Sequence, residues 1–332
     1  MVCISNPQCT FSSGEYMIVI TNRERIGRLS GHDIFRVTSF QILPLPRNLL
    51  SLSESQTTDE QTYVHLLETH LKSNAFYFSY TYDLTQSLQR QAQLPQSTTK
   101  SLWQRADDRF FWNRHISSKL IEATLKGQNL SNFILPIMQG FIEILTTQIN
   151  SKPFIFALIS RRSRFRAGTR YFSRGIDTEG HVSNFIESEQ LLLTDPPAQP
   201  SAPWPTSQQI EGHTQISYVQ VRGSLPLFWA QVNDLNYSPK MRLKEGTDST
   251  QAARRHFDEL LRIYGRQILV NLTNTKGYEL PVGQAYERIV DELHDDRLRY
   301  IHFDFHKECS NMRWHRIQLL LDQLEEDLVQ QR

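Results

Sequence analysis

Cysteine is scarce in this sequence. Among its 332 residues the only cysteines are Cys3, Cys9 and Cys309, too few and too widely spaced for a disulfide framework or a four-cysteine zinc site. This usage favours a reducing compartment over secretion. A small domain that disulfides hold together is therefore excluded, and the fold must depend on a hydrophobic core.

An excess of one charge and long apolar runs are also lacking. Lysine and arginine number 36 against 35 aspartates and glutamates, so the net charge of +1 excludes a globally basic nucleic-acid binder, and 39% hydrophobic residues exclude a wholly disordered chain. Residues 133–145 form the most apolar long stretch, but Pro136, Gly140 and Glu143 interrupt it, and no basic segment at the start leads into an apolar one. We therefore expect a soluble, cytoplasmic chain without a signal peptide or a membrane span.

The common catalytic templates are missing as well. The sequence contains no G-x-S-x-G elbow, no G-x-x-x-x-G-K-[ST] phosphate loop and no H-E-x-x-H. Phosphate chemistry by cysteine needs an arginine after five intervening residues, whereas the sixth residue after Cys3 is Cys9, after Cys9 is Glu15, and after Cys309 is His315. We therefore interpret Cys309 as a partly buried structural thiol.

The hydrophobic pattern predicts a mixed α+β and α/β fold of about two domains. Five of the fourteen prolines lie between residues 195 and 205, which marks 194–215 as a proline-rich loop insertion. Strands and helices alternate beyond residue 216, so we expect right-handed crossovers, a parallel-rich mixed sheet and ligands at the carboxyl ends of its strands. The expected strands are Tyr16–Thr21, Ile34–Leu45, Phe76–Tyr82, Phe154–Ile159, Ile216–Val221, Ile268–Leu272 and Tyr300–Phe305, and the expected helices cover residues 59–71, 252–264, 285–293 and 317–328.

Aromatic residues gather in two places, which we interpret as core and not as base-stacking surfaces. One is the predicted strand at residues 76–82, and the other includes Trp103, Phe110, Phe111 and Trp112. No alternation of basic and aromatic residues accompanies them, so nothing in the pattern favours nucleic acid as a partner.

The strongest local charge signal is a run of arginines without any acidic residue. Arginine presents a planar fork of donors that fits phosphate oxygens, so the run is a candidate phosphate or lipid-headgroup site. The alternative, equally open at this point, is a strand pair whose arginines bond the acidic neighbours Asp177, Glu179, Glu187 and Glu189. The candidate residues are Arg161, Arg162, Arg164, Arg166, Arg170 and Arg174.

His302, Asp304 and His306 alternate along a predicted strand, which would direct all three side chains to one face. Such side chains could ligate zinc or iron. Hydrogen-bonded polar residues at the end of a strand are the commoner explanation, and we favour it.

Several long segments, in order, resemble the Sac-domain phosphoinositide phosphatases. The resemblance covers nearly the whole chain from about Ser13 onward, and within the family the residues are most similar to the endoplasmic reticulum and Golgi branch that acts on phosphatidylinositol 4-phosphate. It is carried by Arg161–Gln190, which begins RRSRFRAGTRYFSRG, by Ser217–Gln231 with the sequence SYVQVRGSLPLFWAQ, by Tyr300–Trp314 with the sequence YIHFDFHKECSNMRW, and more weakly by residues 76–88, 105–113 and 256–276.

The resemblance implies an N-terminal Sac subdomain at residues 1–150, lacking its first strands, packed on a cysteine-phosphatase-like catalytic subdomain at residues 151–332. It implies hydrolysis of a phosphate monoester by a Cys-x5-Arg-Thr loop, without metal or cofactor. The sequence does not contain that loop, so we expect the catalytic subdomain to be incomplete and this chain alone to be inactive. No residue can be assigned as the nucleophile, and Asp304 and His306 match family positions that support the catalytic cleft. The implied partners are phosphoinositide lipids, and the implied location is peripheral to endoplasmic reticulum or Golgi membranes.

A second interpretation is a non-catalytic module that binds phosphoinositide membranes or a protein through its retained surface. A third is a truncated copy whose half sheet leaves an exposed edge.

Overall fold

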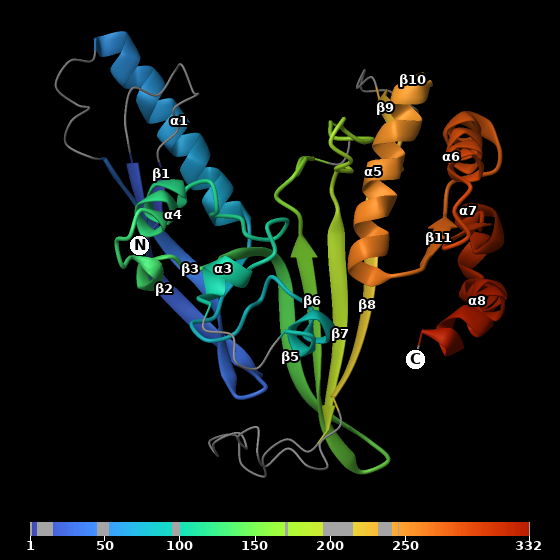
Figure 1. Cartoon of the computed structure of the whole chain (residues 1–332), viewed down its shortest axis with the longest axis horizontal. Coiled ribbons are helices and arrows are strands. Elements are labelled where there is room, and N and C mark those ends of the chain that lie inside the picture. The colour runs from blue at the N-terminus through green and yellow to red at the C-terminus, as the bar shows by residue number, and fades with distance from the viewer. Residues whose placement is uncertain are drawn as a thin grey trace. The chain divides into compact units, whose positions relative to one another are not determined.

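The computed structural model describes residues 2–4, 16–44, 53–94, 100–169, 172–194, 215–231, 241–244 and 246–331. The chain divides into two compact units (Figure 1). Unit 1 comprises Met1–Arg164 and Ile186–Val221, and unit 2 comprises Phe165–Phe185 and Arg222–Arg332. Arg170 and most of the proline-rich loop, residues 195–214, lie outside the described residues.

A large antiparallel sheet dominates unit 1, so the expectation of a parallel-rich sheet is wrong. Its strands follow the sequence order, and every registered pairing from the first strand to the seventh is antiparallel. Of the strand pairings with a defined register among the described residues, only a separate pair of strands in unit 2 is parallel. The strands of the large sheet are β1 (Val2–Ile4), β2 (Tyr16–Leu29), β3 (His32–Pro44), β4 (Phe76–Phe78), β5 (Met138–Ile149), β6 (Lys152–Arg162), β7 (Ile186–Thr194) and β8 (Gln215–Arg222).

Two tight turns explain the antiparallel order. Ser30 and Gly31 join β2 to β3 with φ angles of 45° and 86°, and Asn150 and Ser151 join β5 to β6 with φ angles of 50° and 62°. Two-residue loops with both central residues at positive φ match the twist of antiparallel strands. Each turn therefore forms a hairpin and excludes a crossover at that point.

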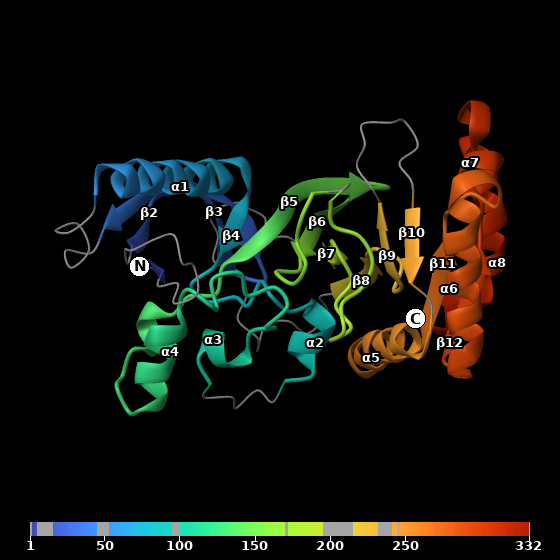
Figure 2. The same cartoon turned by 90° about the horizontal axis from the view of Figure 1, so that it is seen from above.

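The helices of unit 1 are short except for α1 (Glu54–Ser73), which begins at a capping box between Ser53 and Gln56 and lies along β2 and β3 (Figures 1 and 2). The Tyr16 hydroxyl of β2 donates to Glu60 of α1 at 2.5 Å, and burial, followed by this contact, raises the pKa of Tyr16 to about 12. The remaining helices are α2 (Leu88–Ala92), α3 (Leu102–Arg105), α4 (Ser118–Leu125) and the 3-10 helix η2 (Ser131–Phe133).

The predicted aromatic core is confirmed for most of its residues. Phe110 and Phe111 have no exposed surface, Trp103 is buried, and Phe76 to Phe78 are buried in β4. Trp112 is half-buried, and Tyr80 is exposed, against the prediction. The strand predicted through Tyr82 is shorter than expected, because the chain turns after Phe78.

Unit 2 contains the strand and helix alternation that the sequence predicts. The helix α5 ends at Gly265, whose φ of 75° suits glycine. No described helix is both long enough and apolar enough to cross a membrane. The elements are the antiparallel pair β9 (Phe228–Gln231) and β10 (Met241–Lys244), the parallel pair β11 (Gln267–Asn271) and β12 (Leu298–His302), the helices α5 (Thr247–Tyr264), α6 (Leu280–Leu293), α7 (Phe305–Glu308) and α8 (Gln318–Gln330), and the 3-10 helices η4 (Gly277–Glu279), η5 (Ser310–Met312) and η6 (Trp314–Ile317).

Candidate functional site

Polar side chains gather at the carboxyl ends of β11 and β12. The two strands are parallel, and their last residues, Asn271 and His302, lie opposite one another in the register. Each strand then continues into a loop, with Thr273 and Thr275 after β11 and Asp304 after β12. Because the ends of parallel strands meet at one edge, these loops form a single polar surface.

Asp304 is the most firmly held member of this surface. Its carboxylate accepts hydrogen bonds from the Thr275 backbone N–H at 2.8 Å, from the Thr275 hydroxyl at 2.7 Å and from the Lys307 backbone N–H at 2.9 Å, where it caps α7. Burial alone would raise the pKa of Asp304, but these hydrogen bonds outweigh burial and hold the pKa below its usual value. The carboxylate is therefore ionised and fixed in position at neutral pH.

The neighbouring side chains are fixed by the two loops. His302 Nε2 lies 2.9 Å from the Thr273 carbonyl oxygen. The Asn271 amide donates to the Tyr300 hydroxyl at 2.9 Å and accepts from the Thr273 N–H at 3.1 Å. The buried Thr273 hydroxyl has no partner among the described residues. The site thus has a rigid frame with one polar atom still to be satisfied.

The structure corrects the predicted placement of the two histidines. β12 ends at His302, so Asp304 caps α7 and His306 lies within α7, exposed. The three side chains therefore do not share one strand face. Among the described residues no group of three His, Cys, Asp or Glu side chains could hold a metal ion. Cys309 is buried at the end of α7, as predicted.

Lowering the pH should remove the stabilisation that Asp304 provides. A carboxyl whose pKa is lower in the folded state stabilises that state above its unfolded pKa, and this contribution is lost as the pH falls through the folded pKa. We expect Asp304→Asn to destabilise unit 2 at pH 7 and to cost much less near pH 3. Urea unfolding at both pH values measures this, with Asp322→Asn on the exposed face of α8 as the control; an equal cost for Asp304→Asn at the two pH values would contradict it.

Arg161, the first arginine of the run, is fully buried in unit 1. Its guanidinium donates to Glu187 at 2.9 Å, to Glu189 at 2.6 Å and to the carbonyl oxygens of Leu84 and Gln86 at 2.6 and 3.0 Å. Burial would lower the pKa of Arg161, but the two carboxylates outweigh it and hold the pKa above its usual value. Arg161 therefore follows the second alternative from the sequence, in which arginines of the run pair with acidic neighbours.

The ion-pair network around Arg161 also contains charged residues that lie far apart in the sequence. Arg109 Nη2 lies 2.7 Å from Asp107 and 3.7 Å from Glu187, while Glu189 also accepts from the Leu88 N–H at 2.7 Å. Burial would raise the pKa of Asp107, but Arg109 and Arg90 hold it below the usual value. Six buried or half-buried charged groups are thus linked across distant segments, and the sequence indicated only that arginines of the run could pair with Glu187 and Glu189.

The remaining arginines of the run are divided between the two units. Arg162 and Arg164 lie in unit 1, where Arg164 pairs with Asp108 at 2.7 Å, and burial lowers the pKa of Arg162. Arg166 and Arg174 lie in unit 2, where Arg166 donates to the Arg174 carbonyl at 2.8 Å and Arg174 donates to Gln231 at 2.8 Å. These contacts hold both arginines within unit 2.

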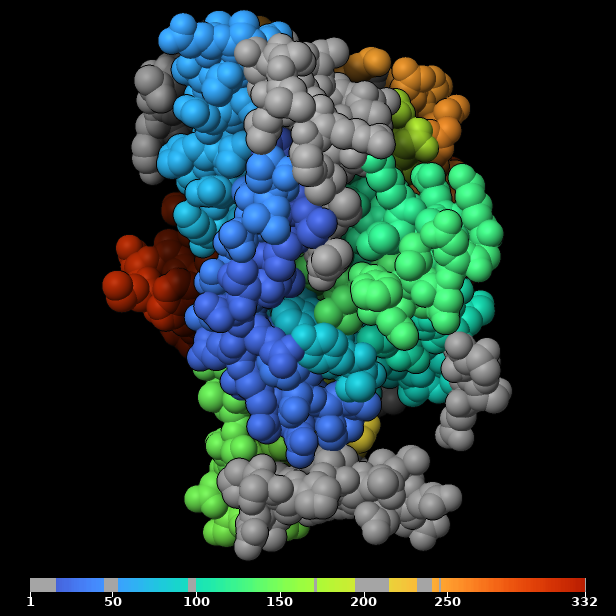
Figure 3. Space-filling view, turned by 90° about the vertical axis from the view of Figure 1, so that its left-hand side faces the viewer, coloured from blue at the N-terminus to red at the C-terminus, as the bar shows by residue number. Residues whose placement is uncertain are grey.

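A groove of about 730 Å³ lies on unit 1, between β2 and the segment Ser131–Leu135. Figure 3 shows this face, with β2 and β3 in blue and α4 in green. Arg23 lines the groove, and its guanidinium lies 4.4 Å from the Phe35 ring centre and 4.9 Å from that of Tyr80. The groove is a candidate surface for a macromolecular partner.

Comparison with known proteins supplies the family context. The SacI homology domain model matches residues 7–310. The chain is 42% identical over 310 residues to Phosphatidylinositol-3-phosphatase SAC1 of Saccharomyces cerevisiae, which covers 93% of this chain and 46% of the relative. It is 40% identical over 315 residues to Phosphatidylinositol-3-phosphatase SAC1-B of Danio rerio, with coverage of 95% and 50%, and 36% identical over 314 residues to Phosphoinositide phosphatase SAC7 of Arabidopsis thaliana, with coverage of 94% and 49%. The chain spans about half the length of these relatives.

Proposed function

Because this chain belongs to the SacI homology domain family, we propose that it holds a phosphorylated inositol headgroup for a phosphoinositide phosphatase reaction. The observation that carries the proposal is the rigid, ionised Asp304 at the carboxyl edge of β11 and β12, where open α/β folds bind ligands. In this proposal the substrate is phosphatidylinositol 4-phosphate at a membrane surface of the endoplasmic reticulum or Golgi.

In this reaction the residues of this chain position the phosphate and supply charge. Phosphoryl transfer depends on orienting the phosphate and on stabilising its charge in the transition state. Asp304, fixed by Thr275, orients the headgroup or the catalytic loop through hydrogen bonds, and the exposed His306 on α7 can donate one to a phosphate oxygen. Arg166 and Arg174 supply positive charge in the same unit. In this proposal these residues only position the phosphate and stabilise its charge. The nucleophile belongs to a Cys-x5-Arg loop that the 332 residues do not contain.

Headgroup binding tests the proposal directly. We expect a soluble phosphatidylinositol 4-phosphate analogue to shift the amide resonances of Thr275 and His306 in labelled protein, and Asp304→Asn and His306→Ala to weaken binding by roughly tenfold. The names of two relatives refer to a 3-phosphatase, so the 3-phosphate analogue is titrated in parallel. Equal or tighter binding of the 3-phosphate would contradict the 4-phosphate preference, and the absence of any shift at this edge would contradict the site.

Residues 1–332 alone should release no phosphate from either analogue. The reason is that none of the three cysteines is followed at the required spacing by an arginine. Release is measured by a colorimetric phosphate assay on the purified chain, with Cys309→Ser as the matched variant. Release that scales with protein concentration and disappears in Cys309→Ser would overturn the prediction and identify Cys309 as a nucleophile.

The alternative is a non-catalytic module that binds a membrane or a protein, and the groove beside Arg23 is the observation in its favour. Sedimentation with vesicles that contain or lack the phosphorylated lipid separates the two. Binding that Arg23→Gln abolishes, with no effect of Asp304→Asn, would favour the module.

A further inference from the structure

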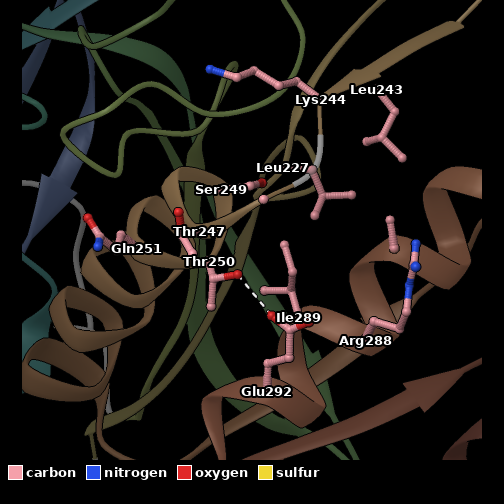
Figure 4. Close-up of a pocket in the computed structure, with 12 residues that line it drawn as sticks. Leu227, Leu243, Lys244, Thr247, Ser249, Thr250, Gln251, Arg288, Ile289 and Glu292 are labelled. Carbon is pink, nitrogen blue, oxygen red and sulfur yellow. Dashed lines mark hydrogen bonds between the residues drawn. The ribbon is translucent and has the colours of Figure 1, made fainter.

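A second pocket, of about 530 Å³, lies in unit 2 away from the strand ends described above. Figure 4 shows it between α5 and α6. Leu227, Leu243 and Ile289 form an apolar wall, and polar side chains from the first turn of α5 form another. A pocket with an apolar wall and a few polar groups on one side fits a small ligand with one polar end.

The first turn of α5 presents donors without acceptors. Its N-cap is Gly246, with a φ of 126°, which has no side chain to cap the helix and open space where a Cβ would lie. The N–H groups of Ser249 and Thr250 bond the Gly246 carbonyl, whereas those of Thr247 and Asp248 find no acceptor among the described residues. Unpaired N–H groups at the start of an 18-residue helix carry partial positive charge and attract anions.

Ser249 supplies an independent observation. Its side chain is 2% exposed, it lines the pocket beside Leu227 (Figure 4), and its hydroxyl has no hydrogen-bond partner among the described residues. Buried hydroxyls are normally satisfied, so this one indicates an acceptor that the described residues do not provide.

The charges around the pocket favour a negative ligand. Among the described lining residues, Lys244 of β10 and Arg288 of α6 are basic and Glu292 is acidic, and Glu292 accepts a hydrogen bond from the Thr250 hydroxyl at 2.9 Å. The Asp248 carboxylate lies 3.5 Å from Lys244, but both side chains are largely exposed, so solvent screens that pair.

We propose that this pocket binds a phosphate monoester. Its oxygens accept hydrogen bonds from the N–H groups of Thr247 and Asp248 and from the Ser249 hydroxyl, and Arg288 contributes positive charge. The ligand is either a phosphorylated lipid headgroup or a free phosphate ester, since the same donors satisfy both. The proposal does not rest on the function proposed above, because the two sites share no residue.

Titration of the labelled full chain tests the proposal with two ligands, inorganic phosphate and a soluble phosphorylated inositol headgroup. We expect the amide resonances of Thr247, Asp248 and Ser249 to shift, and Ser249→Ala and Arg288→Gln each to weaken binding by roughly tenfold. Arg288 is exposed, so its variant leaves the core intact if Ser249→Ala fails to fold. Arg262→Gln, at the other end of α5, removes the same charge and should bind normally.

Both ligand patterns are informative. Equal binding of the two ligands supports the pocket and indicates a free phosphate ester, while binding of the headgroup alone supports it and indicates a lipid. No shift in the first turn of α5 with either ligand, or equal binding by wild type and Arg288→Gln, overturns the proposal.

Discussion

Arg161→Met should destabilise unit 1 by about 3 to 5 kcal/mol, a large share of the 5 to 15 kcal/mol that stabilise a typical domain. The substitution preserves much of the side-chain volume but removes the guanidinium that bonds Glu187 and Glu189, so two carboxylates stay buried without their main partner. It also removes the donor that Arg161 supplies to the Leu84 carbonyl and one of the two donors to the Gln86 carbonyl. Urea unfolding followed by tryptophan fluorescence, to which Trp103 and Trp112 of unit 1 contribute, measures the loss.

Arg164→Met is the matched control, because it removes an arginine of the same run. Arg164 pairs with Asp108 at a half-exposed site, so its loss should cost about 1 kcal/mol or less. Arg161→Lys keeps the charge without the planar fork and should recover only part of the stability. Equal costs for Arg161→Met and Arg164→Met would show that burial of the ion pair contributes little.

The arginine run illustrates what could not be predicted from the sequence alone. The run RRSRFR reads as one patch of charge, but strand register decides each side chain separately. Arg161 faces Glu187 across β6 and β7 and is buried, while Arg166 lies beyond the strand in unit 2. The sequence left two alternatives for Arg161, a phosphate site or a pair with an acidic neighbour. It could not decide between them, because the register that brings Arg161 opposite Glu187 is a property of the whole sheet and not of one segment.

The fold was predictable in its local elements and not in its topology. The pattern located β3, α5, β11 and α8 to within a few residues, because period and capping signals are local. The topology of the large sheet depended on the turns at Ser30 and Asn150, whose sequences lack the Asn-Gly signature of hairpins. The parallel pairing expected beyond residue 216 occurs between β11 and β12, whereas the expected strand Ile216–Val221 became β8 of the large sheet.

The candidate site was likewise predictable in its individual residues and not in the contacts between them. Asp304 was identified by resemblance, but its partner Thr275 lies 29 positions away, and that contact exists only because β11 and β12 run parallel. The pocket at α5 had no sequence signal, since two of its proposed donors are backbone N–H groups and the third is a single buried hydroxyl. Side chains can be proposed from sequence, whereas a site built from backbone needs coordinates.

Gly140→Ala should cost unit 1 at least about 3 kcal/mol. Gly140 lies in β5 with a φ of 155°, opposite Arg161, and a Cβ there would lie 1.8 Å from the Ser160 carbonyl oxygen. Backbone cannot yield as a flexible side chain can, so β5 and β6 would have to separate. The Gly140 N–H, which donates to the Ala75 carbonyl at 3.2 Å, would move with β5.

Gly127→Ala is the control that distinguishes the steric clash at Gly140 from the strain of a positive φ angle. Gly127 is exposed in the same unit, its φ is 97°, and a Cβ there meets nothing within 4 Å, so alanine should cost only about 1 to 2 kcal/mol. Because Gly140 and Arg161 are register partners, a displaced β5 already disturbs the buried ion pairs. The double variant Gly140→Ala with Arg161→Met should therefore lose less than the sum of the single losses, and additive losses would show that the strand register and the charge network are independent.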